Sequence, residues 1–162
     1  MLKRLFLLLP LVAGLANAAP VATPVLEISG KITRFTDPKA KVYRITEAQF
    51  LALPQSSVKT KTKWTPVTTF SGVRMHELLR LVGAKGSIVE LRARDNYSVK
   101  IPIGEFKRYG VVLARSMNGK PLDLDPWGPY FLIYPKDLYP KELNTPETDA
   151  KFPWQVVGIS VQ

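Results

Sequence analysis

The block from Thr60 to Leu79 constrains the fold of this chain most, because a strand pattern and a helix pattern follow one another within it. From Val58 to Trp64, lysines alternate with side chains that suit a half-buried face, a period typical of a β-strand. Further on, Met75, Leu78, Leu79 and Val82 recur at the spacing of an amphipathic helix. The sequence therefore predicts a strand, a loop that carries Trp64, and a helix that Gly83 ends. It also places Thr60 and Trp64 on one face of the strand.

The rest of the chain predicts more short strands than helices. Strands are expected at 25–32, 42–45, 88–94, 98–101, 111–115, 130–134 and 154–161. A capping box at Thr46–Gln49 predicts a short helix up to Leu51 or Ala52, and a further short helix is expected at 103–109. Asn118-Gly119 predicts a tight turn, and residues 123–129 and 136–153 are expected to be loops. Many short strands with a few short helices indicate a single α+β domain over residues 19–162.

The N-terminus has the features of a secretory signal peptide. A basic Met-Leu-Lys-Arg start precedes an apolar run from Leu5 to Leu15, and Ala16-Asn17-Ala18 matches a small-residue cleavage site. The alternative is a membrane anchor, but the apolar run is shorter than the roughly 20 residues that a spanning helix needs. We therefore expect residues 1–18 to be cleaved and residues 19–162 to be periplasmic.

Charge and the cysteine count limit the classes of function. The formal net charge is +10, which often indicates nucleic-acid binding, but an exported location argues against a nucleic acid. The basic side chains are then a solvated face, or a surface for anionic lipid or an acidic partner. The chain has no cysteine, so disulfides, thiolate metal ligands and thiol nucleophiles are excluded. Its stability must come from a hydrophobic core.

Seven short motifs occur in an order and spacing that resembles a known family. They are Trp64-Thr65, Phe70-Ser71-Gly72-Val73, Ala93-x-Asp95-Asn96-Tyr97, Asn118-Gly119-Lys120-Pro121-Leu122, Gly128-Pro129, Ile133-Tyr134-Pro135 and Trp154-Gln155. Together they resemble the molybdopterin-binding domain of the sulfite oxidase superfamily, and in particular its small periplasmic branch that lacks cysteine. The resemblance covers roughly residues 25–161, and it implies a mixed, mainly β fold.

The sequence departs from the family where its molybdenum enzymes hold the metal. Their cysteine ligand lies four residues before the tryptophan and ten before the next aromatic residue, and both counts reach Thr60 here. A hydroxyl is too weakly acidic to replace a thiolate. The family's phosphate-facing arginine and lysine correspond to Phe131 and, approximately, Trp154. The resemblance therefore implies a bound pterin without molybdenum, no metal site, and a protein that is not an enzyme.

The candidate site combines aromatic faces with a carboxylate. Trp64, Trp127 and Trp154 are expected to lie at loop or strand ends, where they can stack on a flat pterin ring. Asp95 is expected to accept hydrogen bonds from the ring's N3–H and 2-amino edge, and Arg115 to face its carbonyl. The candidate ligand-binding residues are Thr60, Trp64, Asp95, Tyr97, Arg115, Trp127 and Trp154.

Each candidate also has an ordinary structural interpretation. Any of the tryptophans suits a core position, Asp95-Asn96 suits a turn with Asn96 in the left-handed region, and Arg115 suits a surface ion pair. His76 is interpreted as a solvent-side residue, because no second His or Cys completes a metal site. Asp123 and Asp125 are interpreted as turn residues rather than a catalytic carboxylate pair.

Three functions follow from these observations. The favoured hypothesis is a pterin-binding sensor or carrier without catalysis. Small relatives of this kind look like adaptors for membrane signalling proteins that make or degrade cyclic di-GMP, so the periplasmic domain of a diguanylate cyclase or phosphodiesterase is the expected partner. The alternatives are a molybdopterin oxidoreductase with atypical metal ligation, and an interaction domain whose pocket is vestigial.

Overall fold

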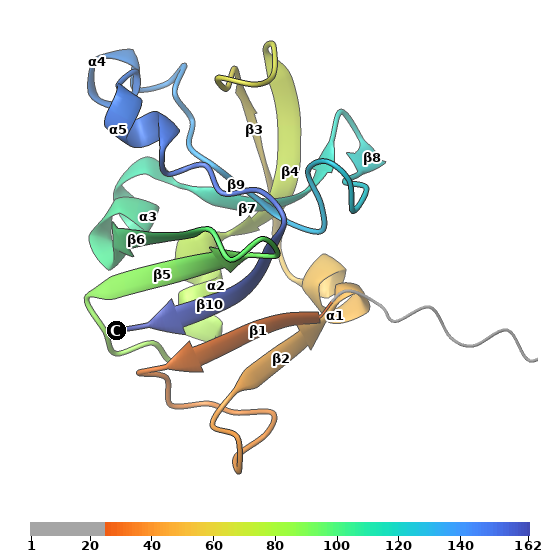
Figure 1. Ribbon diagram of the computed structural model, residues 1–162, viewed down its shortest axis with the longest axis vertical. Helices are drawn as coiled ribbons and strands as arrows, with labels where there is room; N and C mark the ends of the chain where they lie inside the picture. Colours follow the sequence, from red (N-terminus) through yellow and green to blue (C-terminus); the bar gives the residue numbers. More distant parts are fainter. Residues whose placement is uncertain (1–24) are drawn as a thin grey trace, which may run out of the picture.

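The computed structural model describes residues 25–162, and two β-sheets in it share one hydrophobic core (Figure 1). One sheet has the strand order β2-β1-β10-β5-β6. The other has the order β3-β4-β7-β8, with β9 paired to β7. The expected α+β, mainly β fold is thus confirmed. The expected signal peptide, 1–18, and the start of the expected domain at residue 19 lie outside the described residues.

The first sheet has one apolar face and one polar face, as the alternation of side chains along a strand requires. Its strands are β1 (Val25–Gly30), β2 (Tyr43–Thr46), β5 (Ile88–Ala93), β6 (Ser98–Pro102) and β10 (Val156–Val161), with only β1 and β10 parallel to each other. The buried face carries Leu26, Ile28, Ile45, Val89, Leu91, Ile101, Ile159 and Val161. This sheet therefore supplies one wall of the core.

The second sheet supplies the opposite part of the core. It comprises β3 (Gln55–Thr60), β4 (Thr68–Arg74), β7 (Val112–Met117), β8 (Lys120–Pro121) and β9 (Phe131–Ile133). Strands β4 and β7 approach closely at Gly72, where a Cβ atom would lie 2.0 Å from the Leu113 carbonyl oxygen. Only glycine fits at this close approach of the two paired strands.

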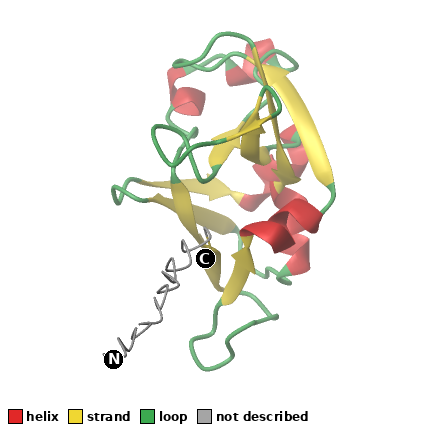
Figure 2. Ribbon diagram, turned by 90° about the vertical axis from the view of Figure 1, so that its right-hand side faces the viewer, coloured by secondary structure: helices red, strands yellow, loops and turns green. Residues whose placement is uncertain are grey.

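The described part of the chain also contains five short helices: α1 (Glu47–Ala52), α2 (Met75–Leu81), α3 (Ile103–Tyr109), α4 (Pro140–Leu143) and α5 (Pro146–Asp149). They lie beside the strands and at one end of the molecule (Figure 2). The predicted capping box is present at Thr46 and Gln49. The predicted apolar stripe of α2 is fully buried, and Gly83 follows the helix with a φ of 64°. Within residues 25–162, no helix has the length and apolar character needed to cross a bilayer.

Three local predictions were wrong. The strand expected to reach Trp64 ends at Thr60, because the Thr62 hydroxyl accepts hydrogen bonds from the next turn and competes with strand pairing. Strand β4 was not predicted, because only a loop of unstated length was expected between the strand and the helix. The loop expected over 136–153 contains α4 and α5, both of which begin with a proline at the first helical position.

Candidate ligand-binding pocket

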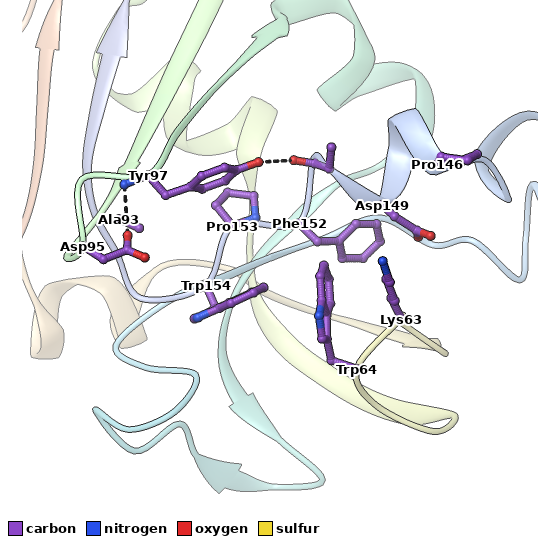
Figure 3. Close-up of a pocket in the computed structure, with 11 residues that line it drawn as sticks. Lys63, Trp64, Ala93, Asp95, Tyr97, Pro146, Asp149, Phe152, Pro153 and Trp154 are labelled. Carbon is purple, nitrogen blue, oxygen red and sulfur yellow. Dashed lines mark hydrogen bonds between the residues drawn. The ribbon is translucent and has the colours of Figure 1, made fainter.

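A cavity of about 470 Å³ opens where three segments from different parts of the chain meet. These segments are the β3–β4 loop, the β5–β6 turn, and the chain from α5 to β10 (Figure 3). The lining residues are Lys63, Trp64, Ala93, Asp95, Tyr97, Pro146, Asp149, Ala150, Phe152, Pro153 and Trp154. The volume lies within the range of small-molecule sites, and the lining is mostly apolar with a few charged groups, as such sites generally are.

Trp64 and Trp154 form an aromatic corner in this pocket. Their ring centroids lie 4.8 Å apart with an interplanar angle of 70°. Trp154 also meets Trp127 edge to face at 5.7 Å, and Trp127 stacks on the buried Phe131 at 5.4 Å. This chain of contacts fixes Trp154 to the core. It also shows that Trp127 supports the pocket from behind and does not line it.

The β3–β4 loop presents Trp64 to solvent through a turn built on Thr62. The Thr62 hydroxyl oxygen accepts hydrogen bonds from the backbone N–H groups of Trp64 at 3.1 Å and of Thr65 at 2.9 Å. Thr62 itself is buried, whereas Trp64 is 39% exposed. The turn therefore keeps the indole ring of Trp64 partly exposed to solvent, and the exposed face of this ring is available to a ligand.

The β5–β6 turn holds Asp95 and Tyr97. Asp95 Oδ1 accepts a hydrogen bond from the Tyr97 N–H at 2.9 Å, and Asn96 has a φ of 68°. This is the turn geometry that the sequence indicated as the ordinary interpretation of Asp95-Asn96. The turn nevertheless directs both side chains to the pocket. The Tyr97 hydroxyl donates to the Ala150 carbonyl at 2.9 Å and so joins two walls of the pocket.

The wall opposite Asp95 contains a carboxylate that sequence reasoning missed, Asp149. It forms an ion pair with Lys136, whose side chain is only 6% exposed. Next to it, Lys151 Nζ binds the Glu105 carboxylate at 2.8 and 2.9 Å, and the Tyr134 hydroxyl donates to Glu105 at 3.0 Å. Burial and the Glu105 carboxylate raise the pKa of Tyr134. Of these groups, the sequence marked only Tyr134, as part of a motif.

Two predicted site residues lie away from the cavity. Arg115 donates to Glu47 Oε1 at 2.7 Å and to the Leu122 carbonyl at 2.6 Å, which is the ion-pair role given above as its alternative. Thr60 is fully buried, and its hydroxyl accepts from the Asp137 N–H at 3.3 Å. Neither residue lines the pocket. Trp64, Asp95, Tyr97 and Trp154 do, so the structure brings four of the seven candidates together.

Comparisons with known proteins give the family. Residues 43–138 match the model of the oxidoreductase molybdopterin binding domain. The chain belongs to this family. Its fold is similar to that of the sulfane dehydrogenase SoxCD from Paracoccus pantotrophus, with a TM-score of 0.62 and 16% sequence identity. The match covers 85% of this chain and 38% of the SoxCD chain, so this chain spans well under half the length of that protein. No match was found among curated proteins.

Family membership confirms the resemblance and corrects one prediction. The sequence alone predicts a protein that is not an enzyme, on the ground that Thr60 replaces a cysteine. The domain family that the chain matches is one of oxidoreductases, and this overturns the prediction. Replacement of one metal ligand does not by itself separate this chain from an enzyme family.

The family implies molybdopterin, and the residues present fit one part of that cofactor. The aromatic corner and the pocket carboxylates fit a flat pterin ring. The chain offers no thiolate to ligate the molybdenum of that cofactor, because it contains no cysteine. The hydroxyl of Thr60, at the corresponding position, is buried and does not line the pocket. Among residues 25–162, no group of three or more His, Asp or Glu side chains could hold a metal ion. Phe131, which the resemblance aligns with the family's arginine, lies in the core, and among residues 25–162 Lys63 is the cation that lines the cavity.

Proposed function

We propose that this chain binds a pterin in the pocket formed by Trp64, Tyr97 and Trp154. The observation that carries the proposal is the aromatic corner of Trp64 and Trp154, exposed in a cavity that also presents carboxylates. In Figure 3, Tyr97 and Trp64 lie on opposite sides of the group of lining residues, with Pro153 between them and Trp154 beside Trp64. A flat heteroaromatic ring can use such faces, and each offset aromatic contact adds about 0.5–1.5 kcal/mol beyond area burial.

Tryptophan fluorescence tests this proposal directly. Pterin and tetrahydropterin should quench the emission of the purified protein in a saturable manner, because two of its three tryptophans line the cavity. Asp95→Ala should weaken pterin binding by roughly 10- to 100-fold if this carboxylate bonds the ring, as expected for a hydrogen bond to a charged group. An emission spectrum that neither pterin changes, together with no heat of binding, would reject the pterin ligand.

The bound pterin is proposed to carry no protein-ligated molybdenum. Its support is the chemistry of the chain: no cysteine anywhere, and a buried hydroxyl at the position of the family's thiolate. Purified protein should therefore show the fluorescence of a bound pterin. Elemental analysis should find no stoichiometric molybdenum in the same protein. One molybdenum atom per chain would refute this part of the proposal.

An oxidoreductase with atypical ligation is the second candidate, and family membership favours it. Under this alternative, the metal would be held without a side-chain thiolate. Elemental analysis together with sulfite and sulfoxide assays on the same preparation separates the two candidates. Metal with turnover supports the oxidoreductase, whereas metal-free protein that binds pterin supports the first proposal.

Export and a membrane partner complete the proposal. Residues 1–18 are proposed to direct export, so that protein expressed in a Gram-negative host should begin at or near Ala19 in the periplasm.

An exported pterin-binding protein can act on the cytoplasm only if its two ligand states bind a membrane-spanning protein differently. The proposed partner is the periplasmic domain of a diguanylate cyclase or cyclic di-GMP phosphodiesterase. A pull-down from solubilised membranes, with and without pterin, tests this. Capture that does not depend on pterin would reject it.

A further inference from the structure

We infer that Asp149, held by the buried Lys136, is the carboxylate that selects for the amino-bearing edge of the pterin, an assignment that rests on the proposed function. Two carboxylates line the cavity, Asp95 and Asp149. Figure 3 shows them at opposite ends of it, with Trp154 between them. A ring in the pocket presents its 2-amino edge to only one of these ends, so the two residues are distinguishable.

The two carboxylates differ in their surroundings. Asp95 is an exposed turn residue, and its Oδ1 already accepts the Tyr97 N–H. The side chain of Asp149 is 27% exposed, and Pro146 and Phe152 lie beside it in the pocket lining. Water competes less for hydrogen bonds to a partly desolvated carboxylate, so a ligand gains more from Asp149 than from Asp95.

Lys136 fixes this carboxylate in place. Its ammonium group binds Asp149 Oδ1, and no other hydrogen bond to that carboxylate is formed by the residues that the structure describes. Oδ2 therefore stays available as an acceptor. Lys136 is itself buried, so its charge depends on Asp149 for compensation. Lys136 is thus a positioning residue, and Asp149 is the residue that bonds the ligand and determines specificity.

The chemistry of selection follows from the acceptor-only character of a carboxylate. A pterin offers an N–H and an amino group on one edge, and both donate to a carboxylate. Lumazine has a carbonyl oxygen in place of the 2-amino group, and that oxygen would face the carboxylate with no proton between them. A buried site built for a donor discriminates strongly against a ligand that lacks it.

Affinities of pterin and lumazine, measured by calorimetry, test the inference. Wild-type protein should prefer pterin by about ten-fold or more. Asp149→Asn should bring this ratio close to one, because an amide can donate to the carbonyl of lumazine as well as accept. Asp95→Asn tests the competing assignment of this edge to Asp95. Asp123→Asn, which changes an exposed carboxylate outside the pocket lining, is the matched control and should keep the preference. Lys136→Gln should lower the ratio as well, a readout that a loss of stability alone would not change.

The outcomes separate failure of this inference from failure of the proposed function. Equal binding of pterin and lumazine by the wild type overturns the inference, whether or not Asp149→Asn folds. Loss of selection in Asp95→Asn with selection retained in Asp149→Asn also overturns it and assigns the edge to Asp95. Binding of neither compound by the wild type overturns the proposed function itself.

Discussion

Trp64 and Trp154 meet edge to face, with ring centroids 4.8 Å apart, although one belongs to the β3–β4 loop and the other to the segment before β10. This contact joins a loop of the second sheet to the segment that leads into β10 of the first sheet, and both residues line the cavity. The pocket is thus a product of how the two sheets pack. Changes to that packing are expected to affect ligand binding as well as stability.

Gly72→Ala should destabilise the fold strongly. A methyl group at this position would lie 2.0 Å from the Leu113 carbonyl oxygen, so β4 and β7 would have to separate. Overpacking against a backbone costs about 1–3 kcal/mol or more. Chemical denaturation measures the effect. Gly104→Ala is the matched control, because a methyl group added there, at the start of α3, would have no neighbouring atom within 4 Å, and it should leave the free energy of unfolding unchanged or raise it. Equal stabilities for the two variants would contradict the close approach of β4 and β7.

Glu105→Ala should lower the free energy of unfolding by about 1–3 kcal/mol, because it leaves both Lys151 and the buried Tyr134 hydroxyl without their acceptor. Glu142→Ala, on the exposed side of α4, should change stability by no more than about 0.5 kcal/mol. Urea denaturation of both variants at neutral pH provides the comparison. A Glu105→Ala protein as stable as the wild type would show that this network does not hold the pocket wall.

Tyr130→Phe should stabilise the protein increasingly as the pH rises above 10. Burial raises the pKa of Tyr130 to about 12, and its hydroxyl has no hydrogen-bond partner among the described residues. Because the folded-state pKa is above the unfolded one, the stability contributed by the neutral phenol is fully present below pH 10. It is lost as the pH rises toward 12, by on the order of 1 kcal/mol at pH 11.

At pH 7, removal of an unpaired buried hydroxyl should be neutral or favourable. Thermal or urea unfolding between pH 7 and pH 11 gives both values. The same dependence on pH in the wild type and in Tyr130→Phe would contradict the burial of this phenol.

The sequence correctly predicted the elements that depend on residues close together in the chain. The apolar stripe of α2, the Thr46–Gln49 capping box and the Asn118-Gly119 turn, with φ values of 51° and 76°, are all present. Strand β4 was missed because its sequence, Thr-Thr-Phe-Ser-Gly-Val-Arg, lacks a clear alternation. What defines β4 is pairing on both sides, since Phe70 lies opposite Val58 of β3 and Gly72 lies opposite Ala114 of β7. Such pairing is tertiary information.

The candidate site was predictable in part for the same reason. Trp64, Asp95, Tyr97 and Trp154 belong to motifs with a fixed local spacing, and all four line the pocket. Asp149 was missed because nothing next to it in sequence indicates a site. Its role depends on Lys136 and on the docking of α5 against the pocket. Arg115 was assigned to the site from its chemistry alone, and Glu47, from a distant part of the sequence, already binds it.

Isothermal titration of pterin into the wild-type protein and into Trp64→Ala tests the central claim most directly. Trp64 is 39% exposed, so its removal should spare the core while it removes one face of the aromatic corner. The account predicts one pterin per wild-type chain and a loss of roughly ten-fold or more in affinity for the variant, in line with the loss of aromatic contact and buried area. Binding of equal strength in both proteins, or none in the wild type, would contradict the assignment of this pocket to a pterin.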